Sequence, residues 1–149
     1  MKTWIVVANA TQVKIFVVHF AKFLQGHESL SLIQEHKHPE SRQHDSEIVS
    51  DKLGNYHGLH EGHGSFVESS DPHQHEAVVF ATTIARILET ARISHAYEQI
   101  ILVAPPHFYG LINKALHANL KKDIARVIEK DYIQENIQDI EKHLRQQIG

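Results

Sequence analysis

The chain has 149 residues, of which 42% are hydrophobic and 22% are charged, enough for one domain with its own hydrophobic core. It contains no cysteine, which excludes a disulfide framework and any site built on a thiolate. The formal net charge of −3 gives no overall attraction to nucleic acid. No apolar run approaches the length of a membrane span, so a cytoplasmic location is expected.

The N-terminal part of the chain predicts three β-strands. Residues 4–8 (WIVVA) and 13–18 (VKIFVV) are rich in β-branched side chains, and residues 9–12 between them suit a tight turn. These two segments therefore predict an antiparallel hairpin. Residues 4–8 are continuously apolar, which is typical of a central strand buried on both faces. Residues 29–36 alternate and predict a third strand nearer an edge.

A long polar segment follows these strands. Residues 36–75 hold eight of the fourteen histidines and have almost no apolar periodicity, which predicts a His/Gly-rich loop at about residues 37–72. Residues 27–76 carry ten acidic residues against three basic ones, a balance of −7, together with nine histidines. Mild acidification could bring this balance to as much as +2, so the segment is also a candidate pH sensor.

A helix is predicted directly after this loop. Asp71 can cap its free amide groups, Pro72 suits its first turn, and an apolar face at helical spacing continues to about Arg92. Residues 99–104 then predict a buried strand, which Pro105 and Pro106 end.

The remaining residues predict two more helices and one more strand. Apolar side chains over about residues 108–116 indicate the second helix, and residues 124–130 alternate as a fifth strand. The last helix carries an apolar stripe that is most simply core, although part of it could serve a homodimer; the stripe is Ile133, Ile137, Ile140, Leu144 and Ile148.

The predicted element order is β-β-β-loop-α-β-α-β-α. Three meandering strands followed by βα units predict a single α/β domain over residues 1–149, with a mixed five-stranded sheet flanked by helices. This is the element order of the ribonuclease H-like fold.

Five segments in order carry a family resemblance: WIVVANATQVKIF, HPESRQHDSEIVSDKLG, SDPHQHEAVVFATTIARILE, ILVAPPHFYGLINKAL and IEKDY. Together they resemble the bacterial host attachment proteins, described as proteins required for attachment to host cells. The resemblance implies a fold related to the middle domain of eukaryotic and archaeal peptide-chain release factors. In that domain a loop presents Gly-Gly-Gln to peptidyl-tRNA. This chain has Gly62-His63-Gly64 and no Gly-Gly-Gln, so the resemblance does not extend to peptide release.

The histidines of the loop are the first candidate site. His57, His60 and His63 recur every three residues and could act as ligands of zinc or nickel or as acid–base groups. Their spacing is not that of the HExxH zinc motif, and a solvated loop with adventitious metal affinity is the simpler interpretation. The further candidates for binding a partner in this loop are Asp51, Gly54, Gly64 and Asp71.

The ends of the predicted strands form a second candidate site. Ligands of open α/β sheets bind outside the carboxyl ends of the strands, where Asn9, Thr11, His107 and Asp131 are expected. A nuclease that uses two metal ions needs several carboxylates there. Asn9 stands where the first acid is expected and no acid follows the fourth strand, so turn or capping roles are favoured.

A third candidate is a basic face of Lys114, Lys121, Lys122 and Arg126, to which Lys130 also contributes. Such a face could bind RNA phosphates, although few aromatic residues accompany it and most charge runs are simply solvated.

The sequence leaves two classes of function open. One is a non-enzymatic interaction module that uses the His/Gly-rich loop on a protein, ribosomal or RNA-containing partner. The other is a hydrolase of peptidyl-tRNA or RNA that uses the loop histidines as acid–base groups or metal ligands. The missing Gly-Gly-Gln and the missing carboxylates favour the interaction module.

Overall fold

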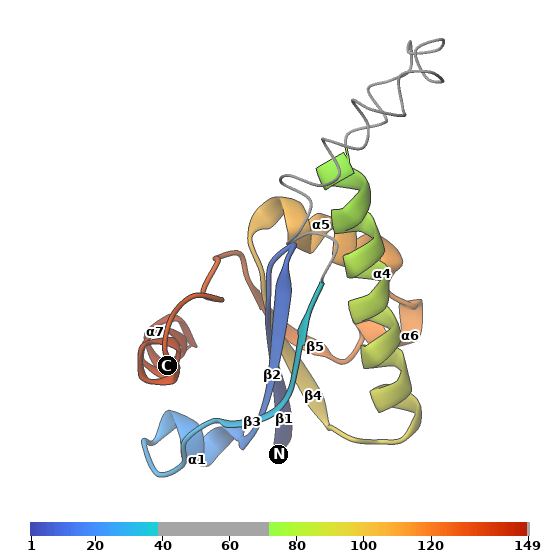
Figure 1. Ribbon diagram of the computed structural model, residues 1–149. Coiled ribbons are helices and arrows are strands. Elements are labelled where there is room, and N and C mark those ends of the chain that lie inside the picture. Colours follow the sequence, from blue (N-terminus) through green and yellow to red (C-terminus); the bar gives the residue numbers. More distant parts are fainter. Residues whose placement is uncertain (39–71, 149) are drawn as a thin grey trace, which may run out of the picture.

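The computed structural model describes residues 1–38 and 72–148 (Figure 1). One open sheet of five strands runs through the described part in the order β3-β2-β1-β4-β5. The strands are β1 (Lys2–Ala8), β2 (Gln12–His19), β3 (Ser31–Lys37), β4 (Gln99–Val103) and β5 (Ile124–Ile128). The helices are α1 (Phe20–Leu24), α4 (Pro72–Ile93), α5 (Pro106–Ala115), α6 (Ala118–Lys121) and α7 (Ile137–Ile148).

The sheet is mixed, as the sequence predicts. β1 pairs antiparallel with β2 and parallel with β4; β2 and β3 are antiparallel, and β4 and β5 are parallel. The continuously apolar β1 is the middle strand and is buried along its length from Thr3 to Ala8, while the alternating β3 is an outer strand. This mixed α/β architecture is confirmed, and it is compatible with the ribonuclease H-like order.

Helices cover both faces of the sheet (Figure 1). On one side, here called the α4 face, α4, α5 and α6 pack against β1 side chains such as Trp4 and Val6. On the other, the α7 face, α7 and α1 pack against Ile5 and Val7. Because successive side chains of a strand point to opposite faces, the apolar run of β1 supplies both cores.

Apart from shifts of one or two residues at other element ends, the described residues differ from the predicted elements in three places. The short helices α1 and α6 were not predicted, since four or five residues are too few to show helical periodicity. α7 begins at Ile137, so Ile133 belongs to the preceding turn, where it is still 1% exposed. β5 ends at Ile128, two residues earlier than expected.

Among the described helices, none combines the length and the apolar character that crossing a lipid bilayer requires.

Candidate functional site

The carboxyl ends of β1, β4 and β5 lie at one edge of the sheet, since these three strands run parallel. We call it the strand-end edge. The turn from β1 to β2, the start of α5 and the segment after β5 all begin there. β3 also ends and α4 also starts at this edge, which is the upper one in Figure 1. It therefore collects the groups that the sequence predicts for a strand-end pocket.

Asn9 organises the turn that follows β1. Its side-chain Oδ1 accepts hydrogen bonds from the Thr11 amide at 2.9 Å, the Thr11 hydroxyl at 3.0 Å and the Gln12 amide at 3.1 Å. This is an Asx turn, in which the side chain replaces a backbone acceptor. The Asn9 Nδ2 donates to both carboxylate oxygens of Asp131 at 3.4 Å. Three of the four predicted strand-end residues are thus brought together, and they bind one another.

Asp131 also caps the chain that follows it, because its Oδ1 accepts a hydrogen bond from the Ile133 amide at 3.2 Å. His107, the fourth predicted residue, lies in the first turn of α5 and contacts α4, where its Nε2 is 3.0 Å from Gln74 Oε1. The strand-end residues therefore make turn, capping and helix-linking contacts.

A polar hollow of about 300 Å³ lies beside the Asn9 turn, lined by Thr11, Gln12, Lys37 and Gln134. Lys37 ends β3 and is exposed, so it supplies a positive charge to the hollow. The hollow can accept a polar or anionic group of a partner.

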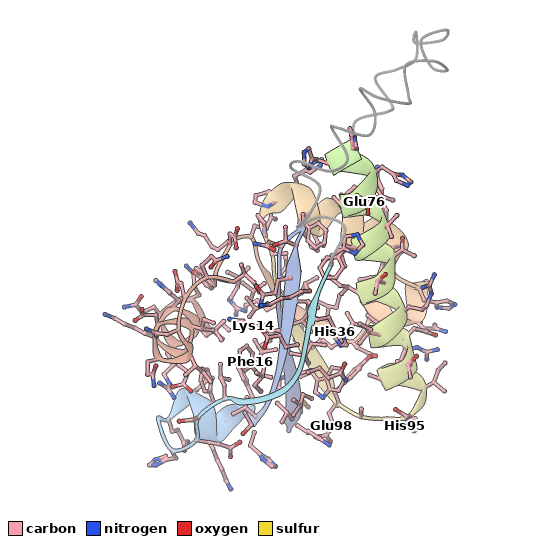
Figure 2. The ribbon with its side chains drawn as sticks, viewed as in Figure 1. Lys14, Phe16, His36, Glu76, His95 and Glu98 are labelled. Atoms are coloured by element: carbon pink, nitrogen blue, oxygen red, sulfur yellow. The ribbon has the colours of Figure 1, made fainter. Side chains whose placement is uncertain are left out.

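Sequence reasoning missed a contact at this edge between His38 and Glu76. His38 Nε2 lies 2.8 Å from Glu76 Oε1, and the two side chains are only 8% and 17% exposed. The His38 ring stacks on Phe80 with centroids 5.1 Å apart, and its amide donates to Thr11 O at 2.9 Å. Figure 2 marks Glu76 near the start of α4. The contact joins the last described residue before position 39 to the first turns after position 71.

A weak sequence signal for this contact existed. Glu76 stands one residue before Ala77 and four before Phe80, so it continues the apolar side of α4. A carboxylate on that side needs a donor. The sequence offered no means of choosing His38 among fourteen histidines.

The predicted loop residues lie outside the described residues. They are Asp51, Gly54, His57, His60, His63, Gly64 and Asp71. Within residues 1–38 and 72–148, no group of three or more His, Asp or Glu side chains is placed to hold a metal ion.

The predicted basic residues are exposed but divide between two sides of the sheet. Lys114 lies in α5, Lys121 ends α6 and Lys122 is the C-cap of α6, all on the α4 face. Arg126 pairs with Ile101 of the opposite core, so it points to the α7 face. The lysines can therefore form one surface without Arg126.

Two tyrosines have shifted pKa values: Tyr97 precedes β4, and Tyr132 directly follows Asp131. Burial and the hydrogen bond from the Tyr97 hydroxyl to Asp123 Oδ2, 2.7 Å long, raise the pKa of Tyr97 well above 10. Burial, with nearby Glu135, raises the pKa of Tyr132, whose ring stacks on His143 at 4.6 Å. Both hydroxyls stay protonated at neutral pH.

The fold and site define a small α/β protein with an open mixed sheet whose polar strand-end groups act mainly as structural links. The chain belongs to the family described as "Protein required for attachment to host cells", whose model matches residues 4–144. No curated protein matches the chain.

Proposed function

We propose that this member of the host attachment family is a non-enzymatic interaction module, which binds a ribosomal or other RNA-containing partner through residues 39–71 and the strand-end edge. The contact between His38 and Glu76 is the observation that supports this proposal. It ties the chain on both sides of that segment to the same point of the fold. Fixing both ends of a binding segment at one point of the fold lowers the entropy cost of presenting that segment to a partner.

The hydrogen bonds at the strand ends favour binding over catalysis. Asn9, Thr11 and Asp131 satisfy one another, so they hold the turn rather than an attacking group or a metal ion. The alternative hydrolase would depend on His57, His60 and His63 as acid–base groups or metal ligands.

Charge complementarity indicates the kind of partner surface. Residues 27–76 have a balance of −7, which suits a basic protein surface, and ribosomal proteins present such surfaces. The exposed Lys114, Lys121 and Lys122 could add contacts to RNA phosphates. A ribosomal partner would place the protein in the cytoplasm and make host attachment an indirect effect.

Affinity capture from the native cell lysate tests the proposal. The full chain is immobilised at about pH 7 and about pH 5.5, and ribosomal RNA, ribosomal proteins, zinc and nickel are quantified in the eluate. We expect the wild type to capture ribosomal RNA and ribosomal proteins. The triple variant His57→Asn, His60→Asn, His63→Asn should no longer capture them. The control variant His19→Asn, His27→Asn, His95→Asn replaces three exposed histidines of the described residues and should capture as the wild type does.

Two results would overturn the proposal. Capture that is equal in both triple variants would show that the segment's histidines do not bind the partner. Hydrolysis of peptidyl-tRNA or RNA by the wild type, lost in the His57, His60, His63 variant and kept in the control, would establish the hydrolase instead.

A further inference from the structure

β3 is the outer strand on its side of the sheet, and within the described residues no strand lies beyond it. An outer strand exposes backbone N–H and C=O groups that can pair with an added strand. Leu32 and Ile33 on β3 are 48% and 44% exposed, so this outer strand presents two adjacent large apolar side chains. Ile33 is the extra residue of a β-bulge, since Gln34 pairs with Ile15 and Leu32 with Phe16.

The bulge limits what the backbone of β3 can offer. The bulge at Ile33 divides β3 into residues 31–32 and 34–37, and the longer stretch is too short for backbone hydrogen bonds alone to hold a partner firmly. Any strand that binds here must gain most of its affinity from its side chains.

A first hollow lies beside β3 on the α4 face. It has a volume of about 320 Å³, and Gln34 of β3, Trp4 of β1 and Ile87, Thr90 and Ala91 of α4 line it. All its lining residues are uncharged, so it suits a neutral apolar side chain. Figure 2 marks His36, the next residue of β3 on this face, on the side toward α4.

A second hollow lies beside β3 on the α7 face, with a volume of about 190 Å³. Its apolar part is formed by Phe16, Leu32 and two isoleucines at the start of α7, Ile137 and Ile140. Figure 2 marks Lys14 and Phe16 on this side of the sheet.

The charged rim of the second hollow is acidic on balance. Glu35 and Glu135 line this hollow with one lysine, Lys14, whose Nζ donates to Ile133 O at 3.2 Å. Glu35 Oε2 accepts a hydrogen bond from Gln12 Nε2 at 2.6 Å, and Glu135 Oε1 lies 3.1 Å from His143 Nε2. A side chain with an aliphatic stem and a positive end, such as arginine, complements this combination.

We propose that β3 binds an extended segment of a partner protein by strand addition, and that this segment alternates apolar and basic side chains. Successive side chains of an added strand point to opposite faces of the sheet, so one set reaches the neutral hollow and the other reaches the acidic one. This inference goes beyond the proposed function, since it concerns the outer strand and not the strand-end edge.

The test uses the synthetic peptide acetyl-Thr-Val-Arg-Val-Arg-Val-Thr-amide with the full chain. Trp4 is the only tryptophan and lines the neutral hollow, so its fluorescence and its single indole N–H resonance report binding there. We expect saturable changes in both signals and shifts of the β3 backbone amide resonances. No saturable change at millimolar peptide would overturn the proposal.

Two comparison peptides separate strand addition from nonspecific adhesion. Replacing both arginines by glutamate should weaken binding at least tenfold, because the second hollow is acidic. Replacing the central valine by proline should do the same, because proline cannot donate to a strand ladder. Equal binding of either peptide contradicts the proposal.

Matched protein variants locate the site. Thr90→Phe should block the neutral hollow and Glu35→Lys should reverse the charge of the acidic one, each lowering affinity for the arginine peptide at least fivefold. Thr82→Phe makes the same change elsewhere on α4, and Glu129→Lys makes the same reversal after β5, so both should bind as the wild type does. Losses as large in these controls would overturn the assignment.

A second copy of the chain is the competing occupant of β3. Sedimentation of the wild type and of Ile33→Lys, without peptide, decides between the two. A monomer in both supports the proposal, and a dimer that Ile33→Lys dissociates overturns it.

Discussion

His38 and Glu76 are 38 positions apart in the sequence, yet His38 Nε2 lies 2.8 Å from Glu76 Oε1, and both side chains are largely buried. The imidazole is packed on Phe80, which in turn stacks on Phe108 of α5 with ring centroids 6.2 Å apart. The pair thus connects the end of β3, the start of α4 and the α4-face core. It anchors the chain on both sides of residues 39–71.

Replacing Glu76 should destabilise the fold. Glu76→Ala removes the contact with the little-exposed His38 ring, and the loss of such a hydrogen bond costs about 0.5–1.5 kcal/mol. Urea unfolding monitored by circular dichroism measures the loss. Glu129→Ala, at an exposed site, should change the free energy of unfolding by less than about 0.5 kcal/mol. If the two variants unfold alike, the contact does not anchor the chain.

Asn9 is expected to matter through its side-chain oxygen. Asn9→Ala removes three accepted hydrogen bonds from the turn and should cost about 1–2 kcal/mol in urea unfolding. Asn9→Asp keeps the acceptor but places a carboxylate beside Asp131, so it should also destabilise. The double variant Asn9→Asp, Asp131→Asn restores an amide–carboxylate pair and should recover most of the loss. No recovery would mean that the two residues are not coupled.

Tyr97 predicts a specific alkaline effect. Its pKa is raised in the folded state above the ordinary value of about 10, so its contribution to stability is complete below pH 10 and is lost as the pH rises further. Tyr97→Phe should cost about 1–2 kcal/mol at neutral pH, since the hydrogen bond to Asp123 disappears. Unfolding at several pH values should show this difference shrinking above pH 10. A difference that grows with pH would contradict the raised pKa.

Leu144 tests whether α7 belongs to the core. Its side chain is 0% exposed, in the same cluster as Ile5 and Phe23, so Leu144→Ala should cost about 2–5 kcal/mol. Gln146→Ala, on the exposed side of α7, is the matched control and should lie within about 0.5 kcal/mol of the wild type. Thermal unfolding distinguishes the two outcomes, and a tolerated Leu144→Ala would indicate that α7 is a peripheral helix.

The elements with long, regular patterns were predictable from the sequence. The continuous apolar run of β1 indicated its central place, and the spacing from Ala77 to Ala91 predicted α4 to within one residue of its end. The helices α1 and α6 are too short to show helical periodicity in the sequence. Ile133 fits the apolar spacing of α7 and is buried, but it lies before the helix begins. Apolar residues in the sequence indicate which positions are buried, but they indicate less well which type of secondary structure those positions belong to.

The strand-end site was partly predictable. Chain order and strand direction placed Asn9, Thr11 and Asp131 at one edge, because parallel neighbours end on the same side of a sheet. The sequence could not show that these groups satisfy one another, since that depends on distances of a few ångströms between segments far apart in the chain.

The sequence by itself determined the α/β class, the middle position of β1 and the family resemblance, because periodicity and local motifs are carried by neighbouring residues. Only the tertiary structure decided that His38 meets Glu76, that Arg126 faces away from the lysines, and that hollows flank β3 on both faces. Those relationships depend on packing between distant elements, which no local pattern encodes.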